Sequence, residues 1–318
     1  MSGPAGDPTP IRKDFLSVLD LAPEGLDRLL ASAHVLKRDR GENGPQSLAG
    51  RHVALLFEKP SLRTRITFVI AIRELGGEVI EPPPDVIFGG RETVEDVARN
   101  LERWVSGVVV RTFAQTRLVR FAAAASRLHV VNALTNEEHP CQALADMMTL
   151  QERLGSLAGR TLTYVGDGNN VAASLAHAGS MLGLHLRFAS PPGFELPAHV
   201  IEACARVARH GSTLTVTHDP FTAVSGADAV YTDVWASMGQ EQEAAARARI
   251  FQPFQVNHAL MEAAAPQAVF MHCLPAHRGI EVTDAVMDSP KSAVFDQAEN
   301  RLHTQKALLA LLMGPARD

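Results

Sequence analysis

The chain has 318 residues and a formal net charge of −5, with 30 basic against 35 acidic residues, and this length suits about two globular domains. Hydrophobic residues make up 46% of the chain and charged residues 20%, which excludes disorder, and a mildly acidic chain without a basic run argues against nucleic-acid binding. No apolar run approaches the ~18 residues of a membrane span, and the polar N-terminus lacks the apolar stretch of a signal peptide. Three scattered cysteines indicate reduced thiols, so we expect a cytoplasmic protein.

Short apolar runs alternate with helical patterns through the first half of the chain. Strands are predicted at 51–57, 78–81, 107–111 and 129–132, and helices at 62–75, 94–104 and 118–126. Such alternation is typical of a parallel sheet covered by helices on both faces.

The same alternation restarts after Gly155. Strands are predicted at 161–165, 184–189, 213–217, 228–232 and 268–273, with helices at 171–182 and about 298–313. We therefore predict an α/β protein with two doubly wound parallel-sheet domains, residues 1–150 and 151–297. A helix over 139–154 would link them, and the C-terminal helix within 298–318 would pack back towards the first domain.

The first polar motif, Ser-Leu-Arg-Thr-Arg at 61–65, follows a predicted buried strand. Ser61 stands where a helix N-cap is expected, and the free N–H groups and dipole of a helix N-terminus bind anions. Arg63 and Arg65 add a planar fork of donors that suits phosphate oxygens. The alternative is a capped helix with two solvated arginines.

The second motif, His-Pro-Cys-Gln at 139–142, opens the linking helix, because Pro140 fits a first helical turn. His139 and Gln142 lie three residues apart and can face one point. Together they could hold a carbonyl oxygen. The alternative is a histidine that only caps the helix.

The third motif is a glycine turn after the strand at 161–165. Gly166 and Gly168 begin a dinucleotide fingerprint, but its third glycine is replaced by Val171. Asn169 and Asn170 instead suggest hydrogen bonds to a polar small molecule. A nucleotide-binding or dehydrogenase function stays open as an alternative from another class.

Three further motifs close the set. Asp233 follows a strand, at the edge of the sheet where open α/β folds place ligand groups, and its carboxylate suits an ammonium group. Cys273 follows another strand and could be a buried small apolar residue. Arg301 lies on the last helix, where an arginine is usually solvated.

Together, in this order, the motifs resemble those of the ornithine carbamoyltransferases, over roughly residues 15–312. The matching segments are 61–65, 139–142, 233–239, 272–275 and 298–301. The resemblance implies transfer of a carbamoyl group from carbamoyl phosphate to the side-chain amine of L-ornithine, giving L-citrulline and phosphate in arginine biosynthesis or breakdown. It also implies a homotrimer or a multiple of it, and neither a metal nor an organic cofactor.

The resemblance also implies roles for individual residues. The carbamoyl phosphate site would comprise Ser61, Leu62, Arg63, Thr64, Arg111, His139, Gln142, Cys273, Leu274 and Arg301. The ornithine site would comprise Asn170, Asp233, Ser237 and Met238. The catalytic residues would be Cys273, Asp233, Arg63, Thr64, Arg111 and His139.

The chain departs from the family pattern at two positions. Leu62 stands where the family often has threonine, and Val69 where it often has glutamate, so a carboxylate that could orient Arg63 is missing. In the loop at 82–91, Arg91 is the candidate for a residue that reaches a neighbouring subunit.

Other amine acceptors are conceivable, namely N-acetylornithine, N-succinylornithine, putrescine and aspartate. Asp233 with the Ser-Met-Gly segment at 237–239 favours an acceptor with a free α-amino group. A catalytically silent family member that acts as a binding protein is the alternative from a different class.

Overall fold

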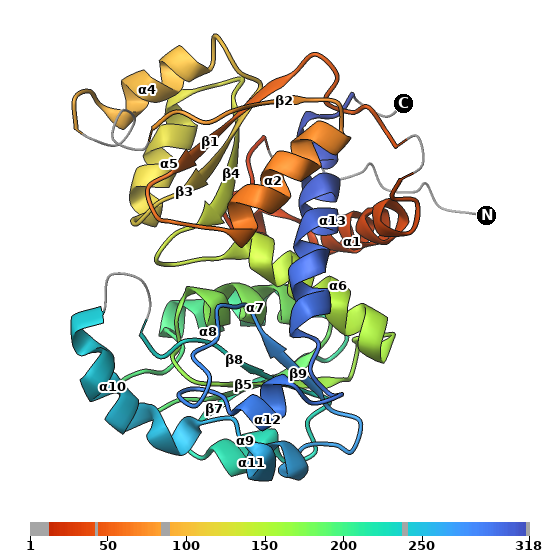
Figure 1. The fold of residues 1–318 in the computed structure, drawn as a ribbon, viewed down its shortest axis with the longest axis vertical. Helices are drawn as coiled ribbons and strands as arrows, with labels where there is room; N and C mark the ends of the chain where they lie inside the picture. Colours follow the sequence, from red (N-terminus) through yellow and green to blue (C-terminus); the bar gives the residue numbers. More distant parts are fainter. Residues whose placement is uncertain (1–12, 42–43, 84–89, 237–240, 316–318) are drawn as a thin grey trace.

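The computed structural model describes residues 13–41, 44–83, 90–236 and 241–315, which form two parallel sheets with helices around each (Figure 1). The first sheet has the strand order β2–β1–β3–β4. Its strands are β1 His52–Phe57, β2 Glu78–Ile80, β3 Gly107–Arg111 and β4 His129–Leu134. The helices of this half are α1 Pro23–Arg38, α2 Arg63–Glu74, α4 Val94–Leu101 and α5 Gln115–Ala124, with a short 3₁₀ turn, η1 Val18–Asp20.

The second sheet has the strand order β7–β6–β5–β8–β9. Its strands are β5 Thr161–Val165, β6 His185–Ala189, β7 Leu214–Thr217, β8 Ala229–Thr232 and β9 Val269–His272. The helices of this half are α7 Asn170–Met181, α8 Ala198–Val207, α9 Pro220–Val224, α10 Ala244–Phe251, α11 His258–Ala263 and α12 Asp284–Met287, with 3₁₀ turns η2 Glu241–Glu243 and η3 Gln252–Phe254.

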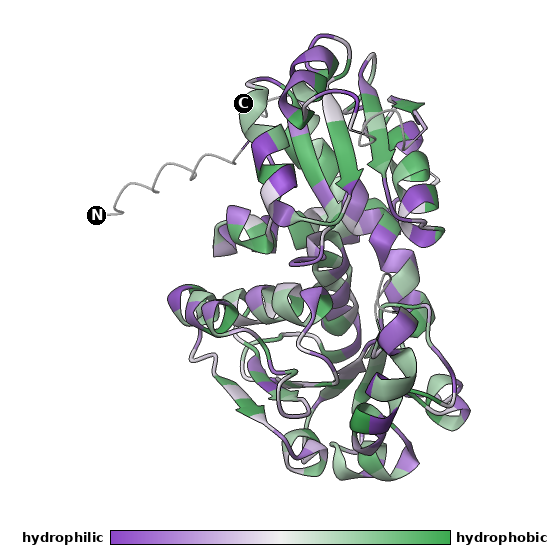
Figure 2. Cartoon of the chain, turned by 90° about the vertical axis from the view of Figure 1, so that its left-hand side faces the viewer, coloured by the Kyte–Doolittle hydropathy of each residue, from purple (hydrophilic) through white to green (hydrophobic). Residues whose placement is uncertain are grey.

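The apolar runs form the central strands because both faces of each sheet are covered. Every residue of β3 is buried, and β1 is buried from Val53 to Phe57. Figure 2 shows these strands as mostly hydrophobic ribbons, while hydrophilic segments gather on the surrounding helices. The sequences of such strands are continuous apolar runs, without the alternation of apolar and polar residues that a strand with one solvated face shows.

Two helices connect the halves: α6 Pro140–Leu154 and α13 Val294–Met313. In Figure 1, α13 runs from beside β9 up to α2, and it packs against α1, α2 and α6. The C-terminal helix therefore packs back onto the first domain, as predicted. One apolar cluster extends from Val53 through Leu144 and Leu308 to Leu162.

The strand register sets the position of the chemistry-bearing turns. Phe57 pairs with Arg111, so the turn after β1 lies beside the end of β3. In the second sheet Tyr164 pairs with Tyr231, and Thr232 pairs with His272. The carboxyl ends of β5, β8 and β9 therefore meet at one edge, as a parallel sheet requires.

The predicted doubly wound α/β fold is confirmed, with shifts at element ends. The C-terminal helix begins at Val294, four residues before its predicted start, and the linking helix is Pro140–Leu154. Helix α1 was not predicted, although Leu26, Leu29 and Leu30 form its buried face. Within the described residues, no helix has both the length and the apolarity to cross a membrane.

Candidate active site

A cavity of about 1040 Å³ opens between the carboxyl ends of the two sheets. Its walls come from the turns after β1, β3 and β4 on one side and after β5, β8 and β9 on the other, with α13 contributing one arginine. The predicted site residues that line it are Ser61, Leu62, Arg63, Thr64, Arg111, His139, Asn170, Asp233, Cys273, Leu274 and Arg301.

Among the predicted residues that the structure describes, one is not in that lining. Gln142 is buried behind Arg301 rather than on the cavity wall. Ser237 and Met238 lie outside the described residues. Their predicted contact with an acceptor stays a prediction.

The start of α2 differs from the sequence prediction in one detail. The N-cap position belongs to Leu62, not Ser61, and no side chain caps it. Leu62 itself has right-handed helical angles, φ −77° and ψ −62°, which are unusual for an N-cap residue. The first intrahelical bond joins the Ile66 N–H to the Leu62 carbonyl at 3.1 Å, so the preceding N–H groups have no helical acceptor.

Cationic side chains gather on this wall without direct ion-pair partners among the described residues. Among the described residues, none of Lys59, Arg63, Arg111 and Arg301 is ion-paired with a carboxylate. Arg111 and Arg301 are 6% and 2% exposed. Burial, with Arg301 close by, lowers the pKa of Arg111 to about 10, and burial lowers the pKa of Arg301. Both remain charged at neutral pH, so the wall attracts an anion.

Arg301 is held by two neutral side chains. It donates to the Gln142 Oε1 at 2.5 Å and to the Thr64 Oγ1 at 2.8 Å, while its Nε has no partner. The contacts join α13, α6 and the first turn of α2. Arg301 therefore lies buried in the cavity lining and not on a solvated helix face, and its predicted role in binding stays a prediction.

His139 closes the same wall from the N-terminus of α6. Its imidazole is 6% exposed, and its Nδ1 has no hydrogen-bond partner. Burial, reinforced by Arg301 and Arg111, keeps the pKa of His139 well below its usual value. The ring is therefore neutral and can offer one N–H donor into the cavity.

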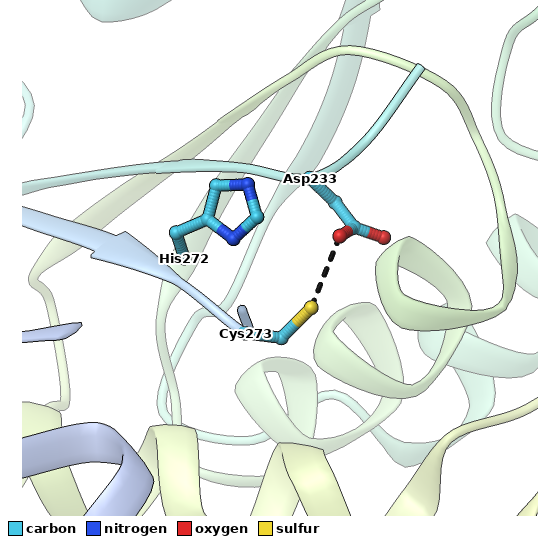
Figure 3. A group of neighbouring side chains, drawn as sticks. All are labelled: Asp233, His272 and Cys273. Atoms are coloured by element: carbon cyan, nitrogen blue, oxygen red, sulfur yellow. Dashed lines mark hydrogen bonds between the residues drawn. The ribbon is translucent and has the colours of Figure 1, made fainter. Parts of the chain in front are cut away.

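The opposite wall is acidic and is built around Asp233, which is 4% exposed at the end of β8. The Cys273 thiol donates to one Asp233 oxygen at 3.0 Å (Figure 3), and the Asn169 amide donates to the other at 2.9 Å. Burial, and then the Asp233 charge, raises the pKa of the Cys273 thiol well above its usual value. Cys273 is therefore a thiol rather than a thiolate.

Asn169 was singled out with Asn170 in the sequence but was not included in the predicted ornithine site, and the predicted contact of Asn170 with an acceptor stays a prediction. The Asn170 amide donates to the Thr135 carbonyl at 2.6 Å, although the residue still lines the cavity. Asn169 caps α7 through the N–H groups of Val171 and Ala172 and also contacts Asp233. Its position as a helix cap was the available signal.

His272 lies beside Cys273 and Asp233 (Figure 3), and the three side chains approach one another as metal ligands do. Both ring nitrogens of His272 are engaged: Nδ1 accepts from the Leu274 N–H at 2.9 Å, and Nε2 lies 3.2 Å from a Glu281 oxygen. The ring thus has no free lone pair for an ion in this arrangement.

A second carboxylate on the acidic wall, Asp167, is neutralised by Arg247. The guanidinium donates to Asp167 at 2.8 Å and to the Trp235 carbonyl at 3.0 Å, and it lies over the Phe194 ring at 4.9 Å. Neither Asp167 nor Arg247 was predicted for the site. Because Asp167 is paired, Asp233 is the buried carboxylate of the cavity lining that is left for a cation, while Glu195 lies in the lining as a more exposed carboxylate.

The two departures from the family pattern have a structural basis. The Leu62 side chain is 70% exposed at the cavity rim, so only its backbone could serve a buried anion. Val69 packs against the main apolar cluster. In the loop at 82–91, Arg91 is exposed, and residues 84–89 lie outside the described residues.

Comparison with protein families matches both halves of the chain. Residues 13–152 match "Aspartate/ornithine carbamoyltransferase, carbamoyl-P binding domain", and residues 158–312 match "Aspartate/ornithine carbamoyltransferase, Asp/Orn binding domain". Two relatives named ornithine carbamoyltransferase are each 50% identical to this chain. The protein from Parafrankia sp. aligns over 305 residues, 95% of this chain and 96% of its own length. The protein from Acidothermus cellulolyticus aligns over 307 residues, 96% and 97%.

The fold is also similar to solved structures of ornithine carbamoyltransferases. Ornithine carbamoyltransferase from Pyrococcus furiosus superimposes with a TM-score of 0.91 at 46% identity, covering 96% of this chain and 98% of that protein. The enzyme from Gloeobacter violaceus gives a TM-score of 0.86 at 45% identity, covering 96% of this chain and 100% of its own.

Proposed function

Since the chain belongs to the aspartate/ornithine carbamoyltransferase family, we propose that it transfers the carbamoyl group of carbamoyl phosphate to the side-chain amine of L-ornithine, giving L-citrulline and phosphate. The observation that carries the proposal is the charge division of the cavity. Arg63, Arg111 and Arg301 lie on one wall, and Asp233 lies on the other. An anionic donor and a cationic acceptor would each meet a complementary surface.

Carbamoyl phosphate would occupy the cationic wall. Its phosphate would accept from Arg63, Arg301 and the N–H groups at the start of α2, with Ser61 and Leu62 at the rim. Arg111, Thr64 and the neutral His139 would donate to the carbamoyl oxygen, where negative charge develops in the transition state. One preorganised donor of this kind contributes on the order of 3 kcal/mol. Gln142, Cys273 and Leu274 complete the proposed donor site.

Ornithine would occupy the acidic wall. Its α-ammonium group would bind Asp233, in place of the Cys273 thiol or beside it, with Asn170, Ser237 and Met238 nearby. The side-chain amine would then face the carbamoyl carbon. An acylated acceptor has no ammonium group at that point, so N-acetylornithine and N-succinylornithine leave Asp233 unmatched.

The amine must lose a proton to react, because its ordinary pKa is about 10.4 by analogy with lysine. Cys273 already carries its proton, so it is not a base in the free protein. We expect the departing phosphate to take the proton as the new C–N bond forms and the carbamoyl C–O bond breaks. Closure of the cavity would exclude water that otherwise hydrolyses the donor.

The proposal also covers the two domains, the oligomeric state, the metabolic role and the cellular location of the protein. We propose that residues 1–150, with the returning C-terminal helix, form the carbamoyl phosphate domain, and that residues 151–297 form the ornithine domain. Family resemblance supports a homotrimer or a multiple of it, with a role in arginine biosynthesis. A cytoplasmic location is supported by Cys141, Cys204 and Cys273, all within the described chain and all free thiols.

Substitution of one arginine tests the donor site. In Arg63→Ala, kcat/KM for carbamoyl phosphate should fall by about two orders of magnitude, because a cationic donor to the leaving phosphate is lost. Arg65→Ala is the matched control, since Arg65 pairs with Glu81 on the outer side of α2 and lies outside the cavity lining. Citrulline and phosphate are measured in parallel. Near-normal turnover in Arg63→Ala, or an equal loss of kcat/KM in both variants, would contradict the assignment of Arg63 to the carbamoyl phosphate site.

A further inference from the structure

A buried carboxylate that the proposed reaction does not use lies directly behind the cavity. Asp146 is fully buried on α6, one helical turn after Gln142. It accepts hydrogen bonds from Gln142 Nε2 at 2.8 Å, Gln297 Nε2 at 2.7 Å and the Tyr231 hydroxyl at 3.2 Å. These donors stand on three different elements: α6, α13 and β8.

Each of the three donors is connected, by a hydrogen bond or along the chain, to a different part of the cavity. Gln142 accepts from Arg301, which in turn donates to Thr64. Tyr231 lies two residues before Asp233 on the same strand end. The Gln297 Oε1 accepts the His272 N–H at 3.1 Å, immediately before Cys273. A single carboxylate is thus connected to the donor wall and to both strand ends that form the acceptor wall.

The charge of Asp146 determines which end of the Gln142 amide faces Arg301. With the NH₂ group donated to the carboxylate, the amide oxygen is left to accept from the guanidinium. The reverse orientation would place two sets of donors against each other at Arg301. Asp146 also supplies negative charge one amide away from a buried cation.

We propose that Asp146 is a positioning residue that fixes Gln142, and through it Arg301, in the orientation that binds the phosphoryl end of the donor. The inference rests on the proposed function, because it takes the cationic wall as the donor site. It adds a role for a residue that touches neither proposed substrate.

The ionisation of this carboxylate gives the proposal a distinctive signature. Burial raises the pKa of Asp146 to about 7, against the hydrogen bonds that favour its charged form. The charged or titratable groups that face it in the described chain are Arg301 on α13, Tyr231 on β8 and Cys273 after β9. As the pH falls through about 7, Asp146 takes up a proton, and donor affinity should decline with it.

The variant Asp146→Asn keeps the shape and removes the charge. The matched control is Thr149→Val, which loses a buried hydrogen bond to Asn300 one turn further along α6, outside the Gln142 connection. Affinity is measured by calorimetry with a phosphonate analogue of carbamoyl phosphate, across pH, for wild type and both variants. The analogue itself titrates in the same way with all three proteins. A decline in affinity at low pH that is missing only in Asp146→Asn is therefore caused by the protonation of Asp146.

We expect Asp146→Asn to bind the analogue at least about tenfold more weakly than wild type at high pH, because a hydrogen bond to a charged group is lost, and to lack the decline near pH 7. Thr149→Val should retain both the affinity and the decline. Equal affinity and an equal pH profile in Asp146→Asn would overturn the proposal. Absence of analogue binding and of citrulline formation in wild type would instead refute the proposed function.

If Asp146→Asn does not fold, Tyr231→Phe decides the question. Removal of this one hydroxyl donor takes a hydrogen bond from the charged carboxylate, so the decline should move to higher pH. If a folded Tyr231→Phe protein loses affinity for the analogue at the same pH as wild type, the proposal is overturned.

Discussion

Arg111 illustrates, at the scale of one residue, how a binding site opposes stability. The residue is 6% exposed, its guanidinium group has no carboxylate partner among the described residues, and its Nε has no hydrogen bond. An unpaired buried charge is costly in the free protein and becomes favourable when an anion binds. Arg111 is therefore accounted for by the anion site that we propose, and not by the stability of the fold.

Arg111→Met should raise the free energy of unfolding by about 1 kcal/mol or more, because an apolar side chain of similar length replaces an unpaired charge. The same variant should lose most of the stabilisation that phosphate gives to wild type. Urea unfolding with and without phosphate checks both effects. A less stable variant that phosphate still protects would contradict this explanation of Arg111.

Cys273 provides a residue-scale test by pH. Burial, with Asp233 beside it, raises the pKa of this thiol above the ordinary 9.0. As the pH rises through about 9, the unfolded chain releases this proton before the folded chain does, so stability falls. The slope for one group reaches at most about 1.4 kcal/mol per pH unit. Cys273→Ser should show a shallower decline in urea unfolding between about pH 8 and 10; equal slopes would refute the shifted thiol.

At the scale of elements, the β5–α7 turn shows why a glycine pattern can mislead. A Cβ built on Gly168 would lie 2.4 Å from the Glu195 carbonyl carbon, and the Gly168 N–H donates to the Phe194 carbonyl at 2.8 Å. The glycine permits a close approach of two backbone segments. It explains the partial dinucleotide fingerprint without any dinucleotide.

Gly168→Ala should therefore shift the turn that holds Asn169 against Asp233. We expect a loss of about 1–3 kcal/mol in stability and a raised KM for ornithine, with a smaller change for carbamoyl phosphate. The control is Gly25→Ala on α1, where the nearest atom to a new Cβ is 3.9 Å away, and where alanine should stabilise the helix by about 0.5–1 kcal/mol. A normal ornithine KM in Gly168→Ala would contradict the link between this turn and Asp233.

The central strands of both sheets were predictable because a strand that is covered on both faces has an almost continuous apolar sequence, as in Gly107–Arg111. Helix starts were less predictable. Val294 begins α13 with no side-chain cap, and Leu62 takes a helical conformation where a serine cap was expected beside it. In both cases tertiary packing, and not a local capping signal, decides the boundary.

The place of Asp233 in the cavity lining was predictable from the strand end that it follows, whereas Arg301 was assigned only through the family resemblance. The site was less predictable where a side chain has a local and a distant partner at once. Asn169 caps α7 locally, and its second hydrogen bond, to Asp233, exists only because β5 and β8 are neighbours. The pairing of Arg247 with Asp167 likewise spans 80 positions, a separation that no local pattern reports.

At the scale of the whole molecule, the two halves share one apolar cluster through α6 and α13. Because neither half buries this surface alone, we expect the chain to unfold in a single transition. Trp235 is buried in the second half, whereas Trp104 is exposed in the first. In a Trp104→Phe variant, Trp235 fluorescence and far-ultraviolet circular dichroism should give the same urea midpoint. Two separated midpoints would show that the halves are stable independently.

The charge division of the cavity is the central claim, and the choice of acceptor tests it most directly. The measurement is formation of the ureido product from carbamoyl phosphate with L-ornithine, and in parallel with N-acetylornithine, N-succinylornithine, putrescine and aspartate. We predict strong citrulline formation with L-ornithine and little product with the N-acylated ornithines, which have no ammonium group for Asp233. Aspartate should also give little product, because its one amine would have to react and would leave Asp233 unmatched, whereas putrescine keeps a second ammonium group and serves as the comparison for an acceptor without a carboxylate. Preferential product from an acylated or acidic acceptor would contradict the acidic wall, and no product from any acceptor would contradict the proposed transfer itself.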